Sequence, residues 1–136
     1  MKTIIDTSTL ISLARINYLD LIPQLRKEVV VPDAVYEEAV IRGEERGFSD
    51  AIVIKSFING HKTRIVNTKS NYIRILRKRV NKVLAKGDEA VLSVALQEKA
   101  KEIMADDDGL GKIAMAMGFS VMARPDLLME GLKRGV

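Results

Sequence analysis

Short apolar runs alternate with segments of helical periodicity along this chain, and no other feature of the sequence constrains its fold as strongly. Uninterrupted apolar residues are typical of parallel strands covered on both faces, because one-sided sheets alternate apolar and polar residues. We therefore expect an α/β fold, a three-layer sandwich with a central, mostly parallel β-sheet. Its strands are predicted at 3–6, 28–32, 63–67, 102–106 and 119–123.

The segments between the predicted strands carry helix start and stop signals. Ser8, Asp33 and Ser49 stand where N-caps are expected, and Pro125 stands in a first turn. No repeat or linker interrupts the chain of 136 residues, so residues 1–136 are predicted to form a single domain. Helices are predicted at 8–16, 18–25, 33–43, 49–60, 70–87, 88–100, 109–118 and 125–135.

The composition excludes several kinds of chemistry. The chain has no cysteine, which removes disulfides, thiolate nucleophiles and zinc–thiolate sites. Its single histidine, His61, lies in a predicted loop, so Ser-His-Asp catalysis and sites with several histidines are not expected. No apolar stretch approaches the roughly 18 residues needed to cross a bilayer. Because Asp6 comes too early for a signal peptide, we expect a cytoplasmic protein without a membrane partner.

Two predicted strands end on aspartates. The apolar run Ile103–Ala105 stops at three consecutive acids, Asp106, Asp107 and Asp108, and the first strand ends on Asp6. Such strand ends are unfavourable, because neighbouring carboxylates raise one another's pKa and oppose folding. In open parallel sheets, ligands bind outside the carboxyl ends of the strands. We therefore expect these aspartates to face one site.

Two further acids are expected beside them. Asp88 follows Gly87 where a helix begins, and Glu38 leaves the edge of the apolar stripe of the predicted helix 33–43. Each acid alone has a simpler explanation as a helix cap, a favourable charge in a first turn or a solvated side chain. Together they need a positive partner, and carboxylate oxygens suit Mg²⁺ or Mn²⁺. The sequence therefore predicts a divalent cation among these acids.

The same segments resemble a known family, the PIN-domain ribonucleases, which include many toxins of toxin–antitoxin pairs. The resemblance covers nearly the whole chain and rests on four stretches in the family's order. These are IIDTSTLISL, VVVPDAVYEEAV, GDEAVLSVAL and IMADDDGLGKIAMAMGFSV.

The resemblance implies an endoribonuclease that hydrolyses RNA phosphodiester bonds with Mg²⁺ or Mn²⁺. The catalytic and metal-binding residues that it implies are Asp6, Glu38, Asp88 and Asp107. Asp106 would be a second or outer-sphere ligand, and Ser8 would orient a ligand beside the first aspartate. The implied partners are an RNA substrate and a small antitoxin protein, and the implied assembly is a homodimer.

The segment 70–87 is strongly basic, in a chain of net charge +4. In this predicted helix, Arg74, Lys78 and Lys82 share a face, and an apolar stripe on another side consists of Ile73, Leu76, Val80 and Val83. We predict that Arg74, Arg77, Lys78 and Lys82 contact RNA phosphates. The alternative is an amphipathic helix whose charges are merely solvated.

Two other functions are compatible with parts of the sequence. The chain could be a non-catalytic basic module that binds RNA or a protein partner and uses its acids as a structural metal site. The stretch ADDDGLGKIAMAMG also resembles an acidic motif of haloacid dehalogenase-like phosphatases. That family needs a second acid two residues after its nucleophilic aspartate, and here Ser8 stands two residues after Asp6. The nuclease is therefore the favoured function.

Overall fold

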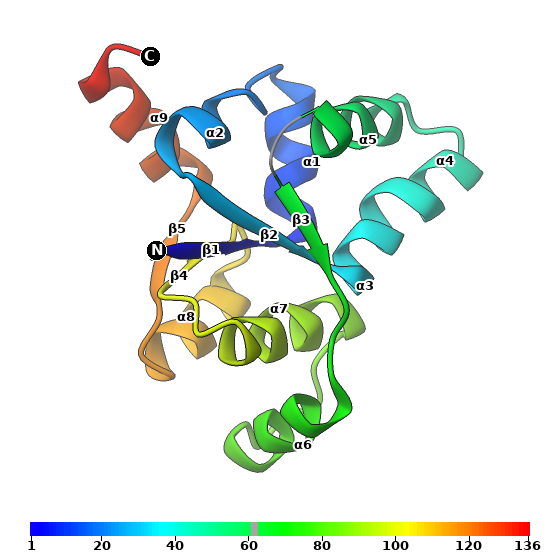
Figure 1. Ribbon diagram of the computed structural model, residues 1–136, viewed down its shortest axis with the longest axis vertical. Helices are drawn as coiled ribbons and strands as arrows, with labels where there is room; N and C mark the ends of the chain where they lie inside the picture. The colour runs from blue at the N-terminus through cyan, green and yellow to red at the C-terminus, as the bar shows by residue number, and fades with distance from the viewer. Residues whose placement is uncertain (61–62) are drawn as a thin grey trace.

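The computed structural model describes residues 1–60 and 63–136, which fold around one five-stranded sheet (Figure 1). All neighbouring strands are parallel, in the order β3-β2-β1-β4-β5. The expected α/β class is confirmed, with a sheet that is wholly rather than mostly parallel. His61, predicted to lie in a loop, falls outside the described residues. The strands are β1 (Lys2–Ile5), β2 (Glu28–Pro32), β3 (Thr63–Val66), β4 (Glu102–Met104) and β5 (Ser120–Met122).

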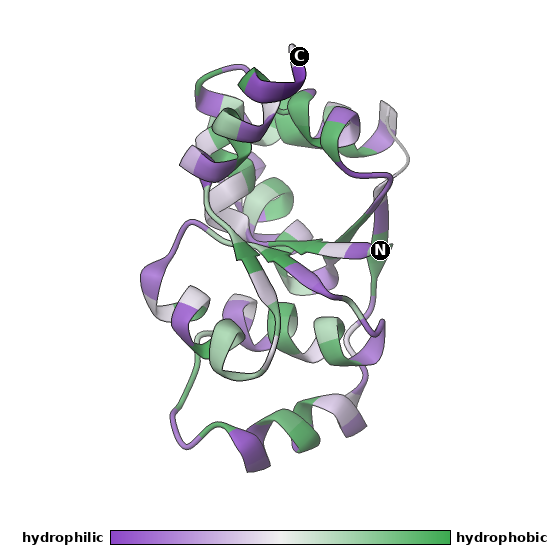
Figure 2. Cartoon of the chain, turned by 90° about the vertical axis from the view of Figure 1, so that its left-hand side faces the viewer, coloured by the Kyte–Doolittle hydropathy of each residue, from purple (hydrophilic) through white to green (hydrophobic). Residues whose placement is uncertain are grey.

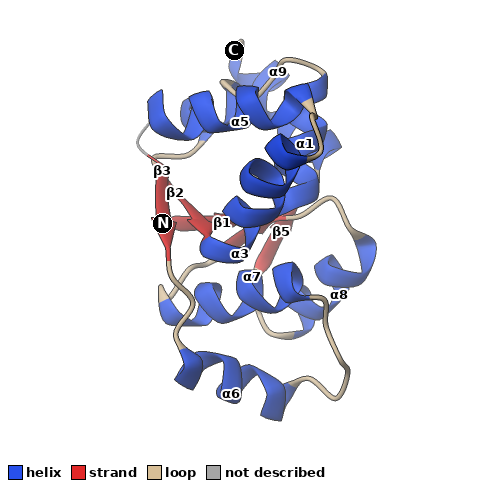
Figure 3. Ribbon diagram, turned by 90° about the vertical axis from the view of Figure 1, so that its right-hand side faces the viewer, coloured by secondary structure: helices blue, strands red, loops and turns tan. Residues whose placement is uncertain are grey.

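Helices cover both faces of the sheet, and this makes the three layers (Figures 1 and 3). One face carries α1 (Thr7–Arg15), α2 (Leu21–Leu25), α5 (Ser49–Gly60) and α9 (Arg124–Arg134). The opposite face carries α7 (Lys86–Gln97) and α8 (Asp108–Ala116), and α6 (Ser70–Arg79) packs on the outer side of α7. Within the described residues, no helix has the length and apolar character needed to cross a membrane.

The core explains why the apolar runs form the central strands. The side chains of Ile4, Ile5, Val31, Ile103 and Met104 have no exposed surface, although they alternate between the two faces of the sheet. Both faces are therefore dry, as continuous apolar patterning predicts. Figure 2 shows these hydrophobic strand segments at the centre, between the two helical layers.

A continuous helical segment from Asp33 to Glu45 carries the chain away from the end of β2. It consists of α3 (Asp33–Tyr36), the π-helical η1 (Glu37–Arg42) and the short α4 (Gly43–Glu45), with helical backbone angles at both junctions. π-Helical turns are rare and occur frequently at functional sites. Here the π-helical turn contains Glu38.

The predicted helix 70–87 is the one element that the structure contradicts beyond its ends. The helix stops at Arg79, residues 80–85 are not helical, and α7 begins at Lys86. Val80 already has extended backbone angles, and Val83 is 96% exposed instead of lying in an apolar stripe. The β-branched valines are weak helix formers, and the chain must return to α7, which packs against the sheet. All other predicted elements agree with the structure within three residues at each end.

Candidate active site

Asp6 follows β1 directly and is only 4% exposed. It is the N-cap of α1, since its Oδ1 accepts a hydrogen bond of 2.9 Å from the backbone N–H of Thr9. The prediction that Ser8 caps this helix is wrong, because β1 ends one residue earlier than expected. Ser8 instead donates its hydroxyl to Asp6 Oδ2 at 3.0 Å and so orients this carboxylate.

Asp106 and Asp107 follow β4 and have different surroundings. Asp107 is the exposed N-cap of α8, with Oδ1 2.9 Å from the backbone nitrogen of Leu110. Asp106 is half-buried and accepts hydrogen bonds on both oxygens, from Ser12 Oγ at 3.2 Å and from the backbone N–H of Arg124 at 3.3 Å. Asp106 is therefore the more firmly positioned of the two. Among the described residues, Asp107 Oδ2 accepts no hydrogen bond, which leaves this oxygen for another partner.

Ser12 is a site residue that the sequence analysis missed. It lies one helical turn after Ser8 on α1, and residues four apart share a helix face. Ser8 and Ser12 thus hold Asp6 and Asp106 from the same side. The spacing of the two serines was the signal that could have identified Ser12.

Glu38 and Asp88 belong to two different helical elements, η1 and α7. Glu38 projects from η1, and its carboxylate lies directly against Gly87, in the first turn of α7. A Cβ atom at position 87 would collide with Glu38 Oε1, so any residue larger than glycine would displace the carboxylate from this position. Gly87 is a second residue whose role the sequence analysis missed. Asp88 is the next residue along the same turn.

Burial and neighbouring negative charges raise the pKa values of three of the acids, Asp6, Glu38 and Asp88. Burial raises the pKa of Asp88, and the charges of Asp107, Asp6 and Glu38 raise it further, while Lys82 opposes the shift. Burial likewise raises the pKa of Glu38, where Asp6 contributes to the increase. The pKa of Asp6 is raised by burial and by Asp106, against hydrogen bonds from Thr9 and Ser8. The structure therefore brings all five predicted acids into one electrostatic cluster, which we call the acidic crevice: Asp6, Glu38, Asp88, Asp106 and Asp107.

The opposite edge of the sheet shows how this protein neutralises a buried acid by itself. Glu102, at the start of β4, is 4% exposed and pairs with Arg26 through contacts of 2.6 and 2.9 Å. Within residues 1–60 and 63–136, Asp6 has no such ion pair, although it is equally buried. Burying a carboxylate without a positive partner is costly. The acidic crevice is therefore destabilising unless it holds a cation.

The residues of the crevice fit a divalent cation in their chemistry. Carboxylate oxygens with additional water are the ordinary ligands of Mg²⁺ and Mn²⁺. Among the described residues, no three acidic or histidine side chains stand close enough together to form a ready-made cation site. A cation would therefore have to draw the side chains inward by rotation, which the free Asp107 Oδ2 and the half-buried Glu38 and Asp88 permit.

The predicted RNA-contacting residues are not on one helix face. Arg74, Arg77 and Lys78 are exposed on α6, whereas Lys82 lies in the connection 80–85, beyond the end of this helix. The expected face shared by Arg74, Lys78 and Lys82 is therefore wrong. Arg77 pairs with Glu89 of α7 through contacts of 2.9 and 3.0 Å and so ties α6 to α7. The charge of Lys82 lowers the pKa of Asp88 against the larger effect of burial.

Several solved structures share this fold. VapC20 from Mycobacterium tuberculosis, described as a sarcin–ricin loop cleaving toxin, matches with a TM-score of 0.64 at 15% identity, over 86% of this chain and 95% of that one. VapBC2 from Rickettsia felis, bound to a DNA fragment from its promoter, matches with a TM-score of 0.64 at 12% identity, over 90% of this chain and 98% of that one. A PilT N-terminus domain protein from Sulfolobus solfataricus matches with a TM-score of 0.58 at 15% identity, over 97% of this chain and 94% of that one.

At these identities the structural likeness shows the fold alone. A search of curated proteins finds no match for this sequence. A family model described as a PIN domain matches residues 2–136, and this span contains all the acids of the crevice. The chain therefore belongs to the PIN-domain family.

Proposed function

We propose that this protein is a metal-dependent endoribonuclease that hydrolyses RNA phosphodiester bonds with Mg²⁺ or Mn²⁺. The observation that carries the proposal is the contrast between two buried acids of one sheet. Glu102 has its own arginine partner, whereas Asp6 lies among four further carboxylates at the carboxyl edge without an ion pair among the described residues. A structure that only needed stability would not retain such a cluster.

The residues of the crevice have separate tasks in this proposal. Asp6, Glu38, Asp88 and Asp107 would hold the cation, and Asp106 would support them as a second or outer ligand. Ser8 and the backbone of Thr9 fix both oxygens of Asp6, while Ser12 and the backbone of Arg124 fix those of Asp106. These hydrogen bonds keep the carboxylates in place in spite of their repulsion.

A bound divalent cation would lower the pKa of water and stabilise negative charge on the attacked phosphate. Hydrolysis would add water across one P–O bond: the phosphorus gains the water oxygen and the leaving oxygen gains a proton, so one RNA fragment ends in a phosphate and the other in a hydroxyl. Lys82 and Lys86 lie close enough to the acids to influence their pKa values, so they can also attract the RNA backbone. We propose that residues 1–136 carry out this reaction as one domain.

Cleavage of a labelled single-stranded RNA in Mn²⁺ tests the proposal. Wild-type protein should cut within the strand, EDTA should stop the reaction, and Asp88→Asn purified in parallel should be inactive while remaining folded. Cleavage that persists in EDTA or in Asp88→Asn would refute the assignment. RNA binding without any Mn²⁺-dependent cleavage would instead support the non-catalytic binding module.

A toxin role is the narrower form of this proposal. Two of the similar structures are a VapC toxin and a VapBC complex, and this likeness supports a small antitoxin protein as a partner. Induction of the gene in bacteria should arrest growth, and Asp6→Asn should not. Arrest by both proteins to the same extent would argue against a toxin that acts by RNA cleavage.

A further inference from the structure

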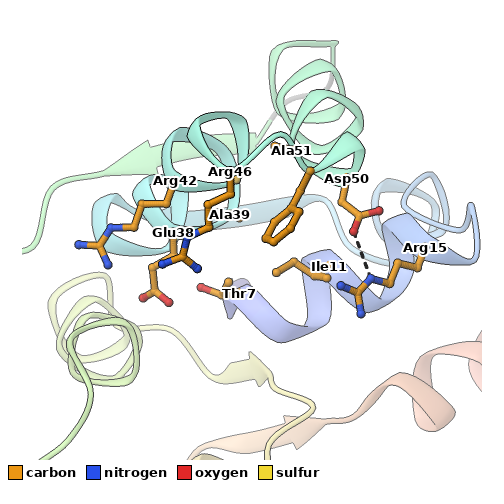
Figure 4. Close-up of a pocket in the computed structure, with 11 residues that line it drawn as sticks. Thr7, Ile11, Arg15, Glu38, Ala39, Arg42, Arg46, Asp50 and Ala51 are labelled. Atoms are coloured by element: carbon orange, nitrogen blue, oxygen red, sulfur yellow. Dashed lines mark hydrogen bonds and ion pairs between the residues drawn. The ribbon is translucent and has the colours of Figure 1, made fainter.

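A pocket of about 200 Å³ opens beside the acidic crevice, between α1 on one side and η1, α4 and α5 on the other (Figure 4). Glu38 and Thr7 form its wall toward the crevice, so the pocket and the predicted cation site share one carboxylate. No motif in the sequence predicted this pocket.

The pocket is lined by three arginines. Arg15 is neutralised by Asp50, with Nε 3.1 Å from Oδ2, and Arg42 has a looser, exposed contact with Glu37 at 3.5 Å. Arg46 makes no ion pair within the described part of the chain, and Figure 4 shows it directed toward Thr7 and Glu38. Positive charge thus gathers directly next to the acidic crevice.

An exposed aromatic side chain completes the lining. Phe48 belongs to a chain with only three phenylalanines, three tyrosines and no tryptophan, and it is 54% exposed at this pocket. Ile11 and Ala51 add apolar surface beside it. Aromatic rings and arginines together are the usual platform for bases and phosphates of single-stranded nucleic acid.

We infer that this pocket is a nucleotide subsite for single-stranded RNA, with Phe48 stacking on one base and Arg46 and Arg42 binding the phosphate attached to it. The inference rests on the proposed ribonuclease function, since it places this nucleotide next to the phosphate held at the acidic crevice. The alternation of charge supports it, because a cation in the crevice and the arginines in the pocket would bind successive phosphates of one strand.

A protein partner fits this pocket less well. A cavity of about 200 Å³ admits one inserted group rather than a whole helix, which measures roughly 10–12 Å across with its side chains. One base or one large side chain fills it. The arginines next to an exposed ring favour the base, since a buried apolar side chain would leave Arg46 without an anionic partner.

Binding of a short, fluorescein-labelled single-stranded RNA tests the subsite, measured by anisotropy with Ca²⁺ in place of Mn²⁺. Phe48→Ala and Phe48→Leu should weaken binding by about five-fold or more, the lower limit for loss of one stacking aromatic. Arg46→Gln should reduce the slope of log affinity against log salt by roughly 0.7. Matched controls are Tyr18→Ala, at a ring that is also 54% exposed, and Arg134→Gln on α9; both should bind like the wild type.

A scan with single abasic nucleotides locates the base. One abasic position next to the cleavage site should weaken binding to the wild type and not to Phe48→Ala, because both changes remove the same stacking contact. Unchanged affinity and salt slope in the Phe48 and Arg46 variants would overturn the subsite, even if Mn²⁺-dependent cleavage persists. Altered sedimentation of these variants with unchanged RNA affinity would also overturn it, in favour of a contact between protein chains. If the Phe48 and Arg46 variants lose RNA affinity but the wild type never cleaves RNA, the nucleotide subsite is upheld and the nuclease function is refuted.

Discussion

Asp6 both caps α1 and places a negative charge in the acidic crevice, and replacing it by asparagine separates these two roles. Asparagine keeps an oxygen for the 2.9 Å hydrogen bond from Thr9, and the hydroxyl of Ser8 can accept from the new amide. The helix cap therefore survives, whereas the negative charge inside the crevice disappears. Alanine removes both, and the loss of a capping side chain costs about 1 kcal/mol. We expect Asp6→Asn in EDTA to be as stable as the wild type or more stable, and Asp6→Ala to be less stable than Asp6→Asn.

Cation binding should reverse the order of stability of the wild type and Asp6→Asn, so that the wild type becomes the more stable of the two. A ligand at 100 times its Kd stabilises the folded state by about 2.7 kcal/mol. For a domain of this size that corresponds to a rise of roughly 10 °C in the melting temperature, at about 4 °C per kcal/mol. The wild type should show this rise with Mn²⁺, and Asp6→Asn should lose most of it.

Thermal unfolding by circular dichroism, in EDTA and in a Mn²⁺ series, measures both effects. Asp20→Asn is the charge control, because Asp20 directly precedes α2, away from the carboxyl edge of the sheet, and should keep the full response to Mn²⁺. If Asp6→Asn is destabilised as much as Asp6→Ala in EDTA and still gains as much from Mn²⁺ as the wild type, Asp6 is a helix cap and not a cation ligand.

Three further predictions concern other parts of the molecule. Gly87→Ala should displace the Glu38 carboxylate and reduce cleavage by about 100-fold without a loss of stability. The control Gly60→Ala, whose new Cβ meets no described atom within 4 Å, should leave cleavage unchanged. Equal cleavage rates of the two variants would refute the role of Gly87. Because burial raises the pKa values of Asp6, Glu38 and Asp88 above ordinary values of 3.8 and 4.5, ionisation of these three acids should cost stability as pH rises through their folded-state pKa values. In urea unfolding without metal, the stability of Asp6→Asn relative to the wild type should therefore increase as pH rises from below 3.8, the ordinary pKa of aspartate, to neutral pH. A difference independent of pH over this range would contradict this. Replacing Arg74 and Lys78 of α6 by glutamine should reduce the salt slope of RNA binding by roughly 0.7 per lost contact, and an unchanged slope would show that these charges are merely solvated.

The sequence was sufficient to predict the fold class because strands that are buried on both faces of a sheet appear in the sequence as continuous apolar runs. A run such as Val29–Val31 is expected in a strand of which neither face meets solvent, and these three valines are buried. The same logic located the acids, since parallel strands bring Asp6 and Asp106 to one edge whatever the details of packing.

Contacts between distant segments were not predictable in this way. Ser12 is visible as a partner of Ser8, but the acceptor of its hydroxyl is Asp106, on another element and 94 residues away. The end of α6 at Arg79 depends on the return of the chain to the sheet, which no local propensity records. The arginine-lined pocket depends on the turn at Gly47, whose left-handed φ of 73° brings α4 and α5 together.

Calorimetric titration with Mn²⁺ tests most directly whether the acidic crevice holds a divalent cation. We expect saturable binding by the wild type that weakens as pH falls, because protons compete for carboxylates whose pKa is raised by burial. Asp6→Asn and Asp88→Asn should each lose this binding while remaining folded. The absence of binding to the wild type at millimolar Mn²⁺, or undiminished binding by both variants, would contradict the account.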